Sequence, residues 1–300
     1  MDGFAARGAP PWFERPPHGL RVLPAGAVAE LAAARIAAAL GAALARRGRA
    51  VFLPSAGRTP LGTYAALRAA HRRGLDWSRV VCAQMDEYEG VGDRDPRGFA
   101  AALRRELVEP LGIGRFLRFH DAEGGLRRPL RAYERAVRTL GGVDVAVQGI
   151  GRNGHVAFNE PGDAGAEETR RVRLARSTCA ANGVLFTHGV TLGLGLLGEA
   201  RETLVLMTGT AKRKAAEAVL FRPGGAANPA AALRRCGRVL VLLDPEAAPE
   251  RLLRAPVRLP AIALLPNGLA AGPGLPDDAL PLAVGNLAGR RPGERAAPNP

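Results

Sequence analysis

The 300-residue chain contains only three cysteines and almost no lysine. Cys82, Cys179 and Cys236 are scattered and form no Cys-x-x-Cys pair, which argues against structural zinc and is typical of a reducing compartment. Long apolar runs are also missing, because none reaches the ~18 residues needed to span a bilayer. The N-terminus carries charged residues and prolines where a signal peptide would have its apolar region. We therefore expect a soluble, cytoplasmic protein with no membrane partner.

The shortage of lysine also bears on the net charge of +14, since Lys212 and Lys214 are the only lysines and arginine supplies the rest. A basic surface can bind nucleic acid by counterion release. Here the arginines are spread over helix surfaces and loops, without the interleaved aromatic residues typical of a single-strand binder. Together with the abundance of Ala, Gly and Pro, this distribution indicates a GC-rich coding bias. We therefore expect no nucleic-acid partner.

Short apolar segments alternate with segments of helical periodicity along most of the chain. The apolar segments cover residues 50–53, 80–83, 143–147, 204–207 and 238–243, and the helical segments cover 27–46, 60–73, 99–111, 131–140 and 211–220. Strands without polar alternation, separated by amphipathic helices, are typical of a parallel sheet covered on both faces. We predict an α/β protein with a three-layer α/β/α architecture and a mostly parallel, Rossmann-like sheet.

The same pattern divides the chain into three regions. Residues 1–20 are rich in proline and glycine and indicate an irregular N-terminal arm. Residues 21–250 carry the alternating strands and helices and are predicted to form one domain. Residues 251–300 are again rich in proline and glycine, with only short apolar runs, and predict a partly ordered C-terminal extension.

The densest group of catalytic-type residues follows the strand predicted at 143–147. It reads Gly149-Ile-Gly-Arg-Asn-Gly-His-Val-Ala-Phe-Asn-Glu-Pro161. Glycines let the backbone approach a ligand, and Glu160 lies close enough to His155 in a tight loop to orient its imidazole. The glycines also fit the Gly-x-Gly-x-x-Gly motif of dinucleotide sites, but no helix opens at the third glycine. We therefore expect an acid–base loop here instead of a dinucleotide site.

Two other predicted strands also end in loops that could carry chemistry. Pro54-Ser-Ala-Gly-Arg-Thr-Pro60 could turn backbone N–H groups toward an anion, although an ordinary strand-to-helix turn is the alternative. Asp86 and Glu87 should point to opposite faces, so that at most one faces a ligand; the alternative is an acidic loop that caps the next helix. Because ligands collect at the carboxyl ends of parallel strands, we expect these three loops to form one site.

In order and approximate spacing these segments resemble the glucosamine-6-phosphate deaminase (isomerase) family, whose wider group includes the 6-phosphogluconolactonases. The matching segments are Pro54–Tyr64, Met85–Tyr88 and Gly149–Pro161, followed by Thr191–Gly195, Gly209–Lys212 and Asn228–Leu233. Phe158-Asn-Glu-Pro161 is the most specific of them, because the related loop of lactonases does not continue in this way. The resemblance covers roughly residues 20–250. It implies conversion of an aminosugar phosphate to a ketose phosphate and ammonia, without a metal or another cofactor.

The resemblance also implies a role for individual residues. His155 would assist opening of the sugar ring by handling the O5 proton, with Glu160 and Asn153 orienting and polarising it. Asp86 would be the base that moves a proton from C2 to C1. The residues expected to bind the substrate phosphate are Ala56, Gly57, Arg58, Thr59 and Lys212.

The sequence departs from the family at the phosphate site. Val184 stands where the family places an arginine on the phosphate, and valine has no donor. Arg58 occupies a position usually held by a small residue, so either it supplies the missing charge or the substrate differs. For Lys212 the alternative is a surface lysine at the start of a helix. Residues that match the allosteric activator site of some relatives are largely absent, and we expect no such activation.

The leading prediction is an enzyme that converts glucosamine 6-phosphate and water to fructose 6-phosphate and ammonia. Two enzymatic alternatives stay open: a divergent paralogue acting on another amino sugar or sugar phosphate in a specialised pathway, and a 6-phosphogluconolactonase-like hydrolase. A catalytically silent protein that binds sugar phosphates or nucleic acid is the alternative from another class. The oligomeric state is also open, and includes a homo-oligomer.

Overall fold

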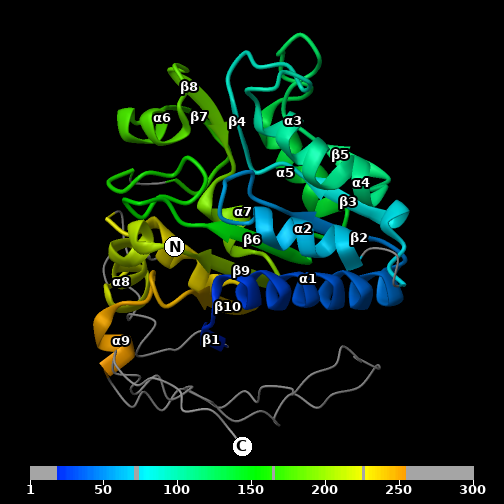
Figure 1. The fold of residues 1–300 in the computed structure, drawn as a ribbon. Coiled ribbons are helices and arrows are strands. Elements are labelled where there is room, and N and C mark those ends of the chain that lie inside the picture. The colour runs from blue at the N-terminus through cyan, green and yellow to red at the C-terminus, as the bar shows by residue number, and fades with distance from the viewer. Residues whose placement is uncertain (1–18, 71–73, 164–165, 225–226, 255–300) are drawn as a thin grey trace, which may run out of the picture. The chain divides into compact units, whose positions relative to one another are not determined.

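The computed structural model describes residues 19–70, 74–163, 166–224 and 227–254 (Figure 1). Most of the predicted arm and nearly all of the predicted C-terminal extension therefore lie outside the described residues. The first described element, β1 (Gly19–Val22), includes the last two residues of the predicted arm. The last, α9 (Glu250–Arg254), is a short helix that includes the start of the predicted extension.

Seven strands form one fully parallel sheet in the order β1-β10-β9-β6-β2-β3-β5. Apart from β1, they are β2 (Ala50–Leu53), β3 (Val80–Ala83), β5 (Arg115–Leu117), β6 (Val145–Gly149), β9 (Glu202–Met207) and β10 (Arg238–Leu243). The five predicted strands are the five inner ones. The sequence analysis missed β1 and β5, which are short, carry an arginine each and lie at the two edges of the sheet.

Helices connect the strands. The longer ones are α1 (Ala25–Arg47), α2 (Leu61–Ala70), α5 (Leu130–Thr139) and α8 (Arg213–Phe221). The helix predicted at 99–111 is one continuous segment made of α3 (Phe99–Leu103), a π-helical turn η2 (Arg104–Val108) and α4 (Glu109–Leu111). Shorter helices are η1 (Trp77–Arg79), α6 (Arg176–Asn182), α7 (Leu194–Gly198), η3 (Thr210–Lys212) and η4 (Pro229–Arg235).

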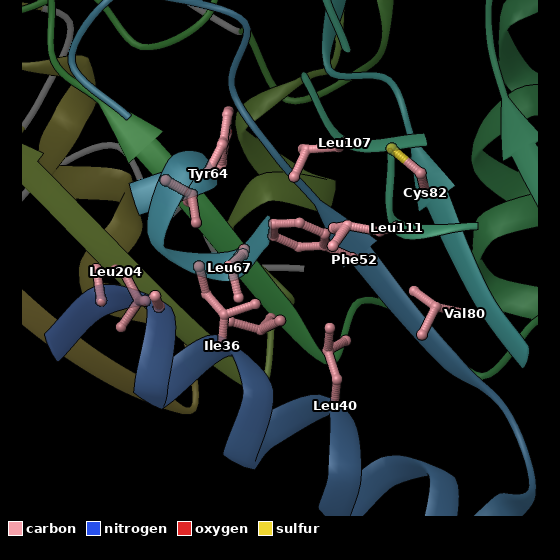
Figure 2. Packing of buried hydrophobic residues seen from close by; sticks show 14 of the residues in the cluster. Ile36, Leu40, Phe52, Tyr64, Leu67, Val80, Cys82, Leu107, Leu111 and Leu204 are labelled. Carbon is pink, nitrogen blue, oxygen red and sulfur yellow. The ribbon is translucent and has the colours of Figure 1, made fainter. Parts of the chain in front are cut away.

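The main apolar core lies between one face of the sheet and helices α1 and α2. Ile36 and Leu40 of α1 and Leu67 of α2 pack with Phe52 of β2, and all four side chains are buried (Figure 2). Burying a large apolar side chain contributes roughly 1.5–3 kcal/mol, so this layer is a major source of stability. α1 ends at Gly48, which adopts a left-handed conformation and donates its N–H to the carbonyl of Leu44.

The other face of the sheet is also covered. Val51, Leu53 and Ala146 alternate with the core residues along β2 and β6 and are fully buried. On this side, Tyr133 of α5 donates its hydroxyl to the carbonyls of Gln84 and Leu117, just beyond β3 and at the end of β5. Helices therefore flank a parallel sheet on both faces, which confirms the predicted three-layer α/β/α fold.

A second, smaller sheet was not predicted. Its three antiparallel strands have the order β4-β8-β7 and are β4 (Asp86–Tyr88), β7 (Arg170–Arg173) and β8 (His188–Thr191). Figure 1 shows them at the top of the view together with α6, while α1 lies across the lower part. β4 starts only two residues after β3, so the chain passes directly from the central sheet into this second sheet.

Among the residues that the structure describes, α1 is the one helix long and apolar enough to cross a membrane by length and composition. A search for uninterrupted apolar runs does not find it, because Glu30 and Arg35 break the run. Its apolar side packs in the core described above, and Arg35 makes a bidentate ion pair with Glu202 of β9 at 2.9–3.0 Å. These contacts are those of a core helix.

Candidate active site

The strand order predicts where a ligand should bind. From β2 the chain adds β3 and β5 on one side of the sheet, and later adds β6, β9 and β10 on the other. The reversal falls between β2 and β6, and ligands of open α/β sheets bind beyond the carboxyl ends of the strands at such a point. The loops after β2, β6 and β9 therefore lie side by side. Two contacts connect them: Ser55 donates its N–H to Val147 at 3.1 Å, and the Lys212 ammonium donates to the Ile150 carbonyl.

The loop after β6 folds back on itself and presents His155. Gly151 donates its N–H to the carbonyl of His155 at 2.8 Å, and Gly154 turns the chain with a φ of 95°. A Cβ atom at position 151 would lie 2.3 Å from the His155 ring. Only glycine therefore leaves room for the imidazole at this place.

Glu160 is held by three side chains at the end of this loop. Asn153 Nδ2 donates to Glu160 Oε2 at 2.7 Å, and Thr178 Oγ1 of α6 donates to Oε1 at 2.5 Å. His155 Nδ1 lies 3.6 Å from Oε2, an ion-pair distance that is too long for a hydrogen bond. Burial would raise the pKa of Glu160, but the imidazole of His155 and the donors Thr178 and Asn153 outweigh it and hold the pKa at about 2. Glu160 is therefore an anion that can orient His155.

Asp86 lies in β4, opposite Thr191 of β8. Its side chain is largely buried, and no hydrogen bond or ion pair reaches its carboxylate from the residues described by the structure. Burial raises the pKa of Asp86 to about 8, and the charge of Glu87 adds to the shift. A carboxylate with a pKa near neutrality is well suited to accept a proton and give it back.

Glu87 points to the other face of β4 and is fully buried. It accepts hydrogen bonds from the N–H groups of Phe99 and Ala100 at 3.0 and 2.8 Å, and so caps the start of α3. The expectation that only one of the two acids is free to face a ligand agrees with these contacts. The alternative, capping of the next helix, applies as well, but to Glu87 and not to Asp86.

Asp86 and the His155 loop both contact the short segment at the end of β8, residues 191–192. Thr191, the register partner of Asp86, accepts a hydrogen bond from the N–H of Phe158 at 3.1 Å. Asn159 donates its amide to the carbonyl of Leu192 at 3.0 Å. No hydrogen bond or ion pair joins Asp86 and His155 among the described residues. The segment at 191–192 fixes the two parts of the site relative to each other.

Three cationic side chains come together beside the loop after β2. Burial lowers the pKa of Lys212, and the positive charges of Arg152 and Arg58 lower it further. The three residues come from the loops after β9, β6 and β2. At Gly57, next to Arg58, no other atom lies within 4 Å of the position that a Cβ would take, so there is space beside this turn. The backbone N–H groups of Ala56, Gly57 and Arg58 donate no backbone hydrogen bond within the part of the chain that the structure describes, and clustered cations beside such a turn are a suitable site for a phosphate.

The phosphate-binding segment predicted from sequence, with Ala56 and Thr59 beside Gly57 and Arg58, is the turn between β2 and α2. Arg152 and Thr178 were missed. Arg152 lies inside the predicted acid–base loop, but a single arginine in an arginine-rich chain does not by itself indicate a binding residue. Thr178 lies in a helix 18 positions beyond Glu160, and only the fold brings the two together.

Val184 has an apolar environment. It is half-buried and packs against an apolar cluster formed by Tyr88, Val91, Phe158 and Leu174. Tyr88 also packs on the ring of Phe158 with a centroid distance of 5.6 Å. The valine is therefore accommodated as part of this cluster. The described residues contain no group of three or more His, Cys, Asp or Glu side chains that could hold a metal ion.

The sequence matches one family model and is similar to enzymes of that family. Residues 24–241 match the family model of glucosamine-6-phosphate isomerases/6-phosphogluconolactonase. A glucosamine-6-phosphate deaminase of Streptomyces avermitilis is 36% identical over 224 residues, which are 71% of this chain and 86% of that protein. One from Cutibacterium acnes is 37% identical over 233 residues, 74% and 87% of the two chains.

Solved structures are similar in fold. A monomeric glucosamine-6-phosphate deaminase of the NagB superfamily superposes with a TM-score of 0.69 at 27% identity, covering 76% of this chain and 98% of that one. The 6-phosphogluconolactonase of Trypanosoma brucei gives a TM-score of 0.64 at 20% identity, with coverage of 82% and 100%. At that identity the lactonase similarity shows the fold alone.

Proposed function

Because the chain belongs to the glucosamine-6-phosphate isomerase/6-phosphogluconolactonase family, we propose that it converts glucosamine 6-phosphate and water to fructose 6-phosphate and ammonia. The observation that carries the proposal is the Glu160 carboxylate, bound by Asn153 and Thr178 and lying 3.6 Å from His155. It belongs to the Phe-Asn-Glu-Pro segment that the sequence analysis found most specific to deaminases. The substrate class, a sugar phosphate, is that of the family.

The first step in the proposed mechanism is ring opening. His155 transfers the proton between O1 and O5 of the sugar, which breaks the bond between C1 and O5 and gives the open aldehyde. Glu160 stays ionised and holds the ring nitrogen Nδ1 on its side, so that Nε2 faces the substrate. Asn153 keeps Glu160 in place through its side-chain amide. Its side-chain oxygen accepts a hydrogen bond from the backbone N–H of His155 at 3.2 Å.

The second step is proton transfer between two neighbouring carbons. Asp86 removes the proton from C2 while O1 takes a proton from the neighbouring C2 ammonium group, which gives an enolamine, and Asp86 then returns its proton to C1. The product is an imine at C2. Water adds to that carbon and ammonia leaves, which gives the ketose phosphate. General base catalysis of this kind contributes typically about 10²- to 10⁴-fold, and it requires that Asp86 be ionised when the substrate is bound.

The phosphate is proposed to bind at the turn between β2 and α2. The backbone of Ala56, Gly57 and Thr59 offers N–H groups, and the cations Arg58 and Lys212 balance the charge. Arg58 here replaces the arginine that the family has in place of Val184. We also propose a cytoplasmic location and leave a homo-oligomer open, in line with a small-molecule substrate and no nucleic-acid or membrane partner.

The experiment that tests the function is an ammonia-release assay on phosphorylated and unphosphorylated hexosamines. We expect release from glucosamine 6-phosphate and little from the unphosphorylated sugar. Release from a different hexosamine phosphate only would favour the divergent paralogue. Arg58→Ala tests the phosphate site, since loss of one charged contact should raise KM about tenfold with little change in kcat. An unchanged KM would rule out the compensation for Val184.

Hydrolysis of 6-phosphogluconolactone is the second candidate activity, because the family that residues 24–241 match also includes 6-phosphogluconolactonases. It needs no base at C2. Asp86→Asn should therefore abolish deamination and leave any lactonase activity in place. Lactone hydrolysis without ammonia release, undiminished in that variant, would replace the proposed function with the lactonase.

A further inference from the structure

The carboxylate of Glu87, the neighbour of Asp86 in β4, is held by hydrogen bonds at both of its oxygens. Its carboxylate is fully buried and accepts four hydrogen bonds, two at each oxygen. The donors are the side-chain amide of Gln84 at 2.7 Å and the backbone N–H groups of Tyr88, Phe99 and Ala100 at 2.9, 3.0 and 2.8 Å. Burial raises the pKa of the Glu87 carboxyl, and these four donors, which stabilise its ionised form, oppose that shift. All four donors are neutral groups.

No cation offsets this charge among the residues that the structure describes. Neither Glu87 nor Asp86 takes part in an ion pair. Of the five other buried acids, four are paired with arginine and the fifth, Asp244, accepts backbone N–H groups; the paired ones are Asp93, Glu134, Asp144 and Glu202. Asp86 and Glu87 are thus a buried acidic pair, of which one member is fixed by hydrogen bonds and the other has no hydrogen-bond or ion-pair partner among the described residues.

The surroundings of the pair add no compensating charge either. In β4 the only other titratable group that acts on it is the phenol of Tyr88. α3, which packs on β4, has the sequence Phe-Ala-Ala-Ala-Leu and carries no charged side chain. β8 contributes His188, but at the end of the strand opposite to Thr191, the partner of Asp86. A buried negative site without a cation is complementary to a cationic ligand group.

We propose that Glu87 is a positioning residue for Asp86, and that the pair makes the site selective for sugars that carry a cationic amino group at C2. The proposal rests on the proposed function, in which Asp86 acts on the C2 proton. An ammonium group at C2 is one bond from that carbon and therefore close to Asp86. Its charge favours the ionised form of Asp86, which is the form able to take the C2 proton.

A neutral hydroxyl at C2 would not have this effect. Burial and Glu87 raise the pKa of Asp86 to about 8, so most of the free protein holds a proton on Asp86 at pH 7. Binding of an ammonium group releases that proton to solvent, whereas binding of the hydroxy sugar leaves it on Asp86. Selectivity and proton release are thus two results of one arrangement.

The test uses two alditol phosphates that lack the C1 carbonyl and cannot react. One is 2-amino-2-deoxyglucitol 6-phosphate and the other is glucitol 6-phosphate. Their dissociation constants and the protons released on binding are measured by calorimetry at pH 7, in two buffers of different ionisation enthalpy. We expect the amino compound to bind the wild-type protein at least about tenfold more tightly, with proton release, and the hydroxy compound to bind without it.

Glu87→Gln should reduce the preference for the amino compound to roughly threefold or less and reduce the proton release, because it removes one of the two charges. Glu89→Gln is the matched control, since Glu89 follows β4, is exposed and pairs with Arg171; it should leave the preference unchanged. A role of Glu87 in folding alone would lower the unfolding temperature but would not move the ratio of the two dissociation constants.

Equal binding of the two compounds by the wild-type protein, or tighter binding of the amino compound without proton release, would overturn the proposal. So would a folded Glu87→Gln variant with the full preference. If that variant does not fold, the proton release of the wild-type protein decides the question. Ammonia release from glucosamine 6-phosphate is measured separately, so the deaminase function can stand while this selectivity fails.

Discussion

Replacing Asp86 with asparagine should make the protein more stable and, at the same time, inactive as a deaminase. Asp86 is largely buried and has no hydrogen-bond or ion-pair partner among the described residues, and its pKa in the folded protein is about 8 instead of 3.8. The folded state therefore binds a proton more tightly than the unfolded state. By linkage, the stability of the wild-type protein falls as the pH rises from about 4 to about 8. Asparagine cannot ionise and removes this loss.

The shift sets the size of the effect. A difference of about four pKa units corresponds to roughly 6 kcal/mol at 1.36 kcal/mol per unit, which is an upper limit. A buried asparagine without partners costs part of this gain, about 1–3 kcal/mol. We therefore expect Asp86→Asn to raise the free energy of unfolding by about 3–5 kcal/mol at pH 8 and above, and to lower it by about 1–3 kcal/mol at pH 4, where the wild-type carboxyl is protonated and only the cost of the asparagine remains.

The measurement is urea unfolding of both proteins at pH 4, 6 and 8, combined with ammonia release from glucosamine 6-phosphate. Glu89→Gln is a suitable control, because its exposed ion pair with Arg171 should contribute less than about 1 kcal/mol. The argument is refuted if Asp86→Asn is no more stable than the wild-type protein at pH 8, or if its gain is the same at pH 4. In either case Asp86 is not a buried, uncompensated acid.

Three further predictions concern the rest of the site. Glu160→Gln should lower stability by about 1–3 kcal/mol at pH 7, because the pKa of Glu160 is held at about 2 against an ordinary 4.5; the loss should disappear as the pH falls from 4.5 toward 2, which a pH series of urea unfolding would show. Lys212→Ala should raise KM for the phosphorylated substrate about tenfold or more, while Lys214→Ala, an exposed lysine two positions away, should leave KM unchanged. Gly151→Ala should lower kcat about 10²-fold or more with an unchanged circular dichroism spectrum, since its Cβ would lie 2.3 Å from the His155 ring; full activity would show that the ring need not lie there.

The inner part of the fold was predictable because it follows from uninterrupted apolar runs. Residues 50–53 and 239–243 are buried along their whole length and could only be inner strands of a covered sheet. The edge strands β1 and β5 have no such pattern, since one of their faces or ends is in contact with water. The second sheet left no signal for a further reason: β4 is three residues long, and two of them are acids, which are seldom buried.

The site could be predicted to the extent that it lies within single loops. The His155 loop carries its own glycines, acid and amide, so its chemistry is visible in thirteen consecutive residues. The partners that complete it come from elsewhere: Thr178 reaches Glu160 from α6, and Thr191 connects the loop to β4. Local sequence contains no information on such contacts. Strand topology predicts that the three loops share one site, and the resemblance to a family adds the individual roles of Asp86 and His155.

The distribution of charge in the site favours an amino sugar phosphate over other ligands of the family. Arg58, Arg152 and Lys212 come from the loops after β2, β6 and β9, whereas Asp86 and Glu87 follow β3, on the other side of β2. A lactone phosphate offers an anion to the first group and nothing charged to the second. A hexosamine phosphate offers an anion and a cation within one small molecule, so each group of charges finds an opposite charge. The amino group, and not the phosphate, should therefore be what distinguishes the substrate of this protein from other sugar phosphates.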